Sequence, residues 1–264
     1  MQHVNVENQE LVRILRISNP PNGYLTDGVV AEMSRALRDA ESSEASVVVL
    51  TGGLPDVFVQ HYDLAELHDI GSQLRAKKMR VDEMAHIPER RIDLLFRAIE
   101  LSSKIVIAAI NGNAMGGGLE MALACDFRIL QKGDFLLGLP EIHVGQLPGA
   151  GGTQRLTRLV GPAKALDLML HGIRLSPDQA MQAGLGHALV DDALEEALNR
   201  AHALAASNAA SLSHIKRLVN NVGQRELYEG LDLERRLFLD LLSSEEGLKR
   251  LGTVCHSDRD FRTL

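Results

Sequence analysis

The apolar positions of this chain follow a strand pattern mainly in its first half and a helical pattern mainly in its second half. Residues 3–18 alternate apolar and polar side chains on either side of a break at residues 8–10, which predicts a β-hairpin. Residues 46–52 and 105–109 are short, mostly apolar runs, which is the pattern of strands that are buried on both faces. We therefore expect several buried strands near the start of the chain and a largely helical end.

Helical spacing of apolar residues is clear in two early segments. One set is Val29, Met33, Leu37 and Ala40, and the other is Ile92, Leu95, Phe96 and Ile99. Further short strands are expected at residues 127–130 and 135–137, and helices at 153–160, from 162, from 177, and over 191–206, 208–222 and 225–251. Residues 66–87 combine many charges with patchy apolar spacing, so both a helix and a loop remain open there.

The most informative stretch runs from Lys104 to Asp126 and joins a buried strand, a glycine-rich turn and an apolar helix. Gly116 to Gly118 form the turn, and Glu120 is the one charged residue of the helix expected over residues 119–125. Such a turn gathers free backbone N–H groups at the positive end of a helix dipole. We therefore expect an oxyanion site with a carboxylate one turn away, although glycine-rich turns also occur in many α/β proteins for structural reasons alone. The stretch lacks the endings of a phosphate loop and of a dinucleotide fingerprint.

Composition narrows the class of protein. A length of 264 residues suits one large domain, or a domain with a small appendage. The formal net charge of −7 argues against a nucleic-acid or anionic-membrane partner. Cys125 and Cys255 make no disulfide framework, no apolar run is long enough to span a membrane, and the N-terminus resembles no targeting signal. We expect a cytoplasmic protein, and the sequence offers no metal-ligand cluster.

Three long motifs carry a resemblance to a known family. They are GNAMGGGLEMALACD, LGLPEIHVGQLPGAGGTQRLTRLVG and LSPDQAMQAGLGHALV. With these motifs in register, the sequence resembles the crotonase family, the enoyl-CoA hydratases and isomerases, over roughly residues 10–250. The resemblance implies an α/β fold, a ClpP-like spiral of ββα units in two roughly perpendicular sheets, with a C-terminal helical trimerisation region. It implies a core over residues 1–195 and a helical region over 196–264 for oligomerisation and active-site cover.

The resemblance also assigns roles to single residues. In the family, two backbone N–H groups stabilise an enolate at the thioester oxygen, and they match Gly117 and Tyr62. The two catalytic glutamates of the hydratases match Glu120 and Glu141. Substrate contacts are expected from Phe58, His61, Asp63, Leu64, Gly116, Leu139, Pro140 and Gly149. The implied substrate is an acyl-CoA thioester, no metal or separate cofactor is implied, and the assembly is a homotrimer or a dimer of trimers.

Some positions depart from the family pattern. His61 stands where the loop before Asp63 usually has glycine, and Ala65 stands where a basic residue often follows. The stretch between Asp63 and the central strand is longer than usual, and the chain ends in HSDRDFRTL instead of a lysine-rich tail. Histidine disfavours positive φ, so we expect an extended loop in which His61 and Tyr62 narrow the acyl tunnel.

Several functions remain open at this point. Hydration of an enoyl thioester is favoured because both glutamates are present, whereas isomerases and other relatives commonly keep one. Isomerisation, hydrolysis or C–C cleavage of an acyl-CoA are alternatives, because one oxyanion scaffold serves many reactions. A non-catalytic binding protein that contacts RNA is disfavoured by the charge, and a serine hydrolase by the absence of a G-x-S-x-G motif.

Overall fold

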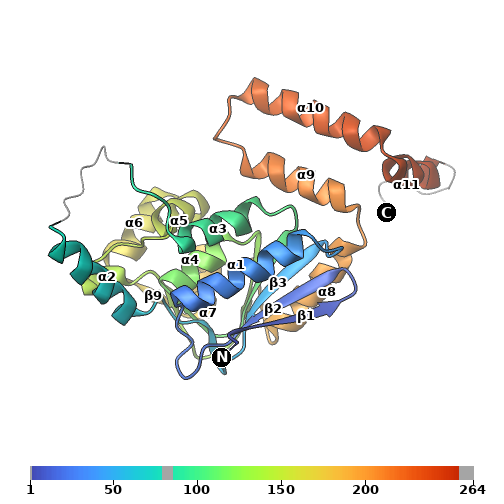
Figure 1. Ribbon diagram of the computed structural model, residues 1–264. Coiled ribbons are helices and arrows are strands. Elements are labelled where there is room, and N and C mark those ends of the chain that lie inside the picture. The colour runs from blue at the N-terminus through green and yellow to red at the C-terminus, as the bar shows by residue number, and fades with distance from the viewer. Residues whose placement is uncertain (1, 79–85, 256–264) are drawn as a thin grey trace.

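The computed structural model describes residues 2–78 and 86–255, and its strands form two sheets (Figure 1). The larger sheet has six strands in the order β1-β2-β3-β5-β7-β10, with β1 and β2 antiparallel and the other neighbours parallel. Its strands are β1 (Val4–Gln9), β2 (Val12–Ile17), β3 (Val47–Gly52), β5 (Ile105–Ile110), β7 (Phe127–Gln131) and β10 (Ala188–Val190). Every residue of β3 and β5 is buried, as their continuous apolar sequences predict.

The smaller sheet has four short strands in the order β4-β6-β8-β9. They are β4 (Val57–Val59), β6 (Asn113–Met115), β8 (Leu137–Gly138) and β9 (Arg174–Leu175). The strands β4, β6 and β8 are parallel, while β8 and β9 are antiparallel. Since β6 follows β5 and leads directly into the next helix, this sheet fixes the position of the glycine-rich turn.

Eleven α-helices and one 3₁₀ helix lie within the described ranges. The helices up to residue 160 are α1 (Asp27–Glu41), α2 (Leu64–Ala76), α3 (Arg91–Leu101), α4 (Gly117–Ala124), the 3₁₀ helix η1 (Glu141–Val144) and α5 (Gly152–Val160). The later ones are α6 (Pro162–Leu170), α7 (Pro177–Ala183), α8 (Ala193–Ala205), α9 (Ala209–Asn220), α10 (Leu227–Ser243) and α11 (Glu245–Cys255). Helix α7 begins and ends at sequence signals: Ser176 and Gln179 form a capping box, and Gly184 ends the helix in the left-handed conformation.

The larger sheet separates two groups of buried apolar side chains. Helices α1, α3 and α4 contribute to the larger group, which also receives side chains from one face of the strands. Helix α8 covers the other face with four alanines, Ala193, Ala197, Ala201 and Ala205. Their spacing of four residues keeps them on one side of the helix. Because alanine is small, α8 can approach the sheet closely. This packing explains why the segment is rich in alanine.

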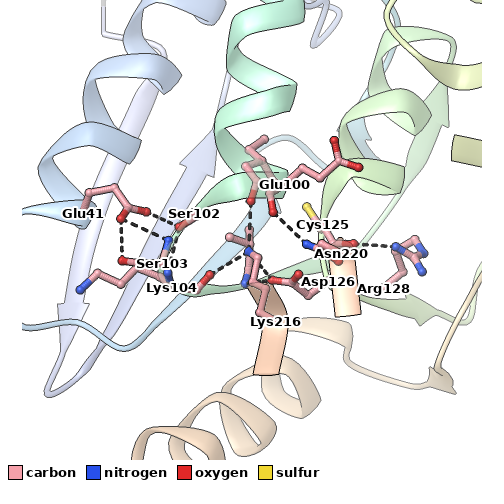
Figure 2. Close-up of polar contacts among 12 residues, drawn as sticks. Glu41, Glu100, Ser102, Ser103, Lys104, Cys125, Asp126, Arg128, Lys216 and Asn220 are labelled. Carbon is pink, nitrogen blue, oxygen red and sulfur yellow. Dashed lines mark hydrogen bonds and ion pairs between the residues drawn. The ribbon is translucent and has the colours of Figure 1, made fainter. Parts of the chain in front are cut away.

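The last three helices extend from the body of the molecule (Figure 1). Helix α9 is docked by Lys216, whose Nζ donates to Asp126 Oδ2 at 2.7 Å and to the carbonyls of Ile99 and Lys104 at 3.1 and 2.9 Å (Figure 2). Asn220 adds a hydrogen bond from Nδ2 to the Glu100 carbonyl at 3.0 Å. These contacts fix α9 to the segments around α3, β5 and the end of α4.

Most of the predicted elements are confirmed, with some corrections. Phe135 lies outside the strands, because β8 comprises Leu137 and Gly138 alone. The segment expected as one helix over residues 225–251 is divided at Ser244, whose ψ of 147° is extended. Residues 64–76 form α2, which settles part of the ambiguous stretch, whereas residues 79–85 lie outside the described ranges. Residue 195, where the sequence places the end of the core, lies inside α8, and the division into a core and a C-terminal region stays a prediction.

Candidate active site

The glycine-rich turn begins at Gly116, between β6 and α4. Gly116 has φ 48° and ψ −123°, a conformation that disfavours any side chain. Gly118 lies against β4, because a Cβ placed on it would be 1.9 Å from the Val59 carbonyl oxygen. Glycine is therefore required at these two positions for different reasons. Gly116 adopts a special backbone conformation, and Gly118 lies where two chain segments approach closely. Helix α4 starts at Gly117, two residues earlier than the sequence predicts.

Two backbone N–H groups are left without acceptors beside this turn. The loop before α2 pairs with Leu25, which donates to the His61 carbonyl at 2.8 Å and accepts from the Asp63 N–H at 2.9 Å. This pairing leaves the Tyr62 N–H free, and a Cβ on Gly117 would lie 3.5 Å from that nitrogen. Neither the Tyr62 N–H nor the Gly117 N–H donates to any residue of the described ranges. Two adjacent, unused donors can stabilise a negatively charged oxygen.

Glu120 lies one turn inside α4 and is 3% exposed. Its Oε1 accepts hydrogen bonds from the N–H groups of Ala150 and Gly152, both at 2.8 Å. Burial raises the pKa of Glu120, while these two N–H groups and the charges of Arg90 and Arg155 act in the opposite direction. The carboxylate is thus hydrogen-bonded rather than unpaired, and it sits at the N-terminus of α5, where the helix dipole favours a negative charge.

Glu141 is the first residue of η1 and lies on the other side of the turn. Its Oε1 is 3.1 Å from the position of a Cβ on Gly116. Its Oε2 is buried and has no hydrogen-bond partner within the described residues. Burial raises the pKa of Glu141 to about 7, with a further contribution in the same direction from the charge of Glu120. The two glutamates therefore come together at the turn, and Glu141 carries its proton far more readily than an ordinary carboxyl.

His61 and Tyr62 take the extended path that the sequence predicts. His61 is not among the described residues with positive φ. Its ring stacks on Tyr24 with centroids 4.7 Å apart, and its Nδ1 lies 2.8 Å from the Tyr62 carbonyl oxygen. Burial raises the pKa of the Tyr62 hydroxyl, and a hydrogen bond with Glu66 acts in the same direction. Since the His61 Cβ is 3.6 Å from a Cβ position on Gly116, His61 borders the same turn as Glu141.

The other residues that the sequence predicts as substrate contacts lie in several different environments. Phe58 and Leu139 are buried in the core, at 1% and 3% exposure. Asp63 caps α2, because its Oδ1 accepts from the Ala65 N–H at 2.8 Å. Leu64, the first residue of α2, is 48% exposed. Pro140 is the residue before η1, and Gly149 lies three residues before the start of α5.

Sequence reasoning missed two arginines at this site. Arg90 precedes α3, and its Nη2 donates to the Gly149 carbonyl. Arg155 lies in α5, and its Nη1 donates to the Ala150 carbonyl at 2.9 Å. Both belong to segments with several charges, and nothing in their spacing connects them with Glu120. The GAGG run of residues 149–152 was the one available signal, since glycines allow backbone groups to approach a ligand or a side chain.

Residues 2–78 and 86–255 contain no group of three His, Cys, Asp or Glu side chains suited to a metal ion. In the same ranges, each helix is too short or insufficiently apolar to cross a membrane. The expectations of no metal, no separate cofactor, no nucleic-acid partner and a cytoplasmic location stay predictions.

The chain is similar to known proteins over most of its length. The family model described as enoyl-CoA hydratase/isomerase matches residues 7–252. The mitochondrial enoyl-CoA hydratase of Pongo abelii is 34% identical over 240 residues, which cover 89% of this chain and 78% of that protein. The short-chain-enoyl-CoA hydratase of Clostridium acetobutylicum is 32% identical over 256 residues, covering 93% and 92%. The crystal structure of an enoyl-CoA hydratase from Bacillus anthracis has a TM-score of 0.85 at 30% identity and covers 95% of each chain.

Proposed function

The chain belongs to the enoyl-CoA hydratase/isomerase family, and on that premise we propose that it hydrates a trans-2-enoyl-CoA to a 3-hydroxyacyl-CoA. It is an enzyme of the lyase class, and the match with solved enoyl-CoA hydratases gives it the crotonase fold. One observation supports the specific reaction most strongly. Glu120 and Glu141 flank one glycine turn, beside the unused N–H groups of Gly117 and Tyr62.

The thioester oxygen of the substrate accepts the Gly117 and Tyr62 N–H groups in this proposal. Attack of water on Cβ moves an electron pair toward that oxygen, and the two donors stabilise the enolate that forms. Both donors belong to backbone that is already fixed by β-type pairing and by the start of α4, so little reorganisation accompanies the reaction. This part of the site would serve hydration and isomerisation equally.

The glutamates supply the proton transfers that make the reaction a hydration. Glu120 is surrounded by donors that stabilise its carboxylate, so it takes a proton from the attacking water. Glu141 has a pKa of about 7 and an unpartnered oxygen, so it gives a proton to Cα. The water oxygen thus bonds to Cβ and the proton to Cα, and transfer of one proton from Glu120 to Glu141 restores both side chains.

The test follows the loss of ultraviolet absorbance when a conjugated enoyl thioester is hydrated. We expect Glu120→Gln and Glu141→Gln each to lower kcat at least about a hundredfold, the scale of a lost general acid or base. Binding of a saturated acyl-CoA, which cannot be hydrated, should survive in both variants. The matched control is Glu44→Gln, because Glu44 is exposed and lies far from the turn in sequence. A Glu141→Gln variant with near wild-type hydration would contradict the proposal and favour a one-glutamate isomerase.

A further inference from the structure

Arg90 contacts the loop of residues 149–152, which holds Glu120, through a main-chain carbonyl of that loop. Its guanidinium forms two hydrogen bonds to Asp93, from Nε at 2.9 Å and from Nη2 at 2.8 Å. Nη2 also donates to the Gly149 carbonyl oxygen. The Arg90 backbone N–H donates to Asp93 Oδ2 at 2.9 Å, which fixes the residue at the start of α3. The fork-shaped guanidinium is therefore oriented by Asp93 while one nitrogen reaches the loop.

The Gly149 carbonyl and the Ala150 N–H belong to one planar peptide group. Arg90 bonds the oxygen of that group, and the N–H of the same group donates to Glu120 Oε1 at 2.8 Å. A charged donor on the oxygen polarises the peptide and strengthens the hydrogen bond made by its N–H. Arg155 acts on the next carbonyl, that of Ala150, at 2.9 Å. The loop that holds Glu120 is thus itself held by two arginines.

We propose that Arg90 is a positioning residue for Glu120, which orients the Gly149–Ala150 peptide so that Glu120 stays ionised and directed at the attacking water. The proposal rests on the proposed hydration, because it assigns Glu120 the role of base. It goes beyond that function by placing part of the control of Glu120 on α3, outside the turn and the loop. Arg90 touches no reacting atom in this scheme and acts through the peptide.

The charges around Glu120 support the same assignment. Among the described residues, the charges that act at Glu120 are those of Arg90, which caps α3, Arg155 on α5 and Glu141 on η1. The two arginines act against the burial that raises the pKa of Glu120, and the pKa of Arg90 is raised first by its hydrogen bonds to Asp93 and further by the charges of Asp93 and Glu120. Loss of Arg90 removes a positive charge and loosens an N–H donor, and both changes raise the pKa of Glu120. The acid limb of the kcat profile, where Glu120 becomes protonated, should therefore move to higher pH.

The experiment compares Arg90→Gln, Arg90→Lys and the control Arg97→Gln with wild type. Arg97 lies in α3, the helix that Arg90 caps, and pairs with Glu89 at 2.6 Å. We expect Arg90→Gln to lower kcat about 10- to 100-fold, with KM within about threefold, because a misplaced catalytic group costs rates of that order. Its acid limb should shift upward. Lysine keeps the positive charge but lacks the forked guanidinium, so the kcat and the acid limb of Arg90→Lys should lie between those of wild type and Arg90→Gln. Arg97→Gln should match wild type.

A second readout needs no turnover. Hydrogen exchange at the amides of Ala150 and Gly152, measured by mass spectrometry, should be faster in Arg90→Gln and unchanged in Arg97→Gln. An Arg90→Gln enzyme with unchanged kcat, acid limb and exchange would overturn the proposal. If Arg90→Gln does not fold, Arg90→Lys decides: a three- to tenfold lower kcat with faster exchange supports the proposal, and wild-type values overturn it. A wild type that hydrates no enoyl thioester contradicts the proposed function, whereas the exchange result still reports on Arg90.

Discussion

Glu120 and Glu141 are the same residue type in one site, and their neighbours favour opposite charge states. Burial raises the pKa of Glu120, as it does that of Glu141, but two N–H groups and two arginines stabilise the carboxylate of Glu120 alone. Glu141 has a buried oxygen without a partner and lies beside the charge of Glu120. Interacting carboxyls of this kind titrate as a pair, and their surroundings decide which one keeps the proton. The assignment of base and acid in the proposed reaction follows from this difference.

The raised pKa of Glu141 also predicts how stability depends on pH. The folded protein binds the Glu141 proton more tightly than the unfolded chain, because its pKa rises from 4.5 to about 7. Between these two pH values, the contribution of Glu141 to stability falls as pH rises. Glu141→Gln has no proton to lose, so it should equal wild type at pH 4 and exceed it at pH 8 by about 1 kcal/mol, the lower end of the cost of an unsatisfied buried group. Urea unfolding at both pH values measures this, and an equal difference at both would contradict it.

His61 predicts a specificity effect rather than a proton-transfer effect. Its ring stacks on Tyr24 and its Nδ1 lies within hydrogen-bond distance of the Tyr62 carbonyl oxygen. The residue borders the turn next to Glu141. His61→Ala should alter KM and the preferred acyl length, with kcat on the best substrate within about tenfold, since pocket contacts contribute about 1–3 kcal/mol to discrimination. Kinetics over enoyl-CoAs of graded length test this. A thousandfold collapse of kcat with loss of one limb of the pH profile would identify His61 as an acid–base residue.

At the scale of single elements, α4 shows what the sequence can predict and where it stops. Gly116, Gly118 and Glu120 lie within five consecutive residues, so their strand–turn–helix pattern is visible without a structure. The role of Arg90 cannot be predicted from the sequence, because its partner Gly149 is 59 residues away. The contact is also made to a main-chain carbonyl, which every residue has, so no residue type marks it. Helix α2 was ambiguous for a related reason. It buries none of its residues, so no core face imposes a strong pattern.

The glycines of α4 predict different tolerances at adjacent positions. Gly118→Ala places a Cβ 1.9 Å from the Val59 carbonyl oxygen, so β4 or α4 must move. We expect a loss of at least about 2 kcal/mol in the free energy of unfolding. Gly117→Ala is the matched control, because its nearest neighbours lie at 3.5 Å or beyond and alanine favours a helix. Its stability should stay within about 1 kcal/mol of wild type in urea unfolding. Equal losses in both variants would contradict this reasoning.

At the scale of the whole molecule, Lys216 joins the C-terminal helices to the core. Its ammonium group is buried and has three oxygen partners, including Asp126, which lies two residues after the end of α4 (Figure 2). Asp126 Oδ2 also accepts from the Val106 N–H at 2.7 Å, so one carboxylate connects α9, β5 and the segment after α4. Removing one partner of a buried ion pair is strongly destabilising. Helix α9 is therefore firmly placed, whereas no comparable buried ion pair is found for α10 and α11 within the described residues.

The surface of α9 to α11 predicts that the protein associates with itself. Leu227, Tyr228, Phe238, Leu239 and Leu248 are between 58% and 81% exposed, and an apolar cleft of about 350 Å³ lies between α9 and α10. Exposed apolar side chains that gather on one part of a surface mark an interface with another chain. With the trimeric assembly that the family resemblance implies, we expect a homotrimer of about 86 kDa, three times 28.8 kDa, or a dimer of such trimers, in light scattering after size exclusion. Phe238→Asp with Leu239→Asp should yield a smaller species, because each buried charge disfavours the interface. Leu11→Asp, in the exposed turn between β1 and β2, is the control and should leave the mass unchanged. A wild type of 28.8 kDa at micromolar concentration would contradict the prediction.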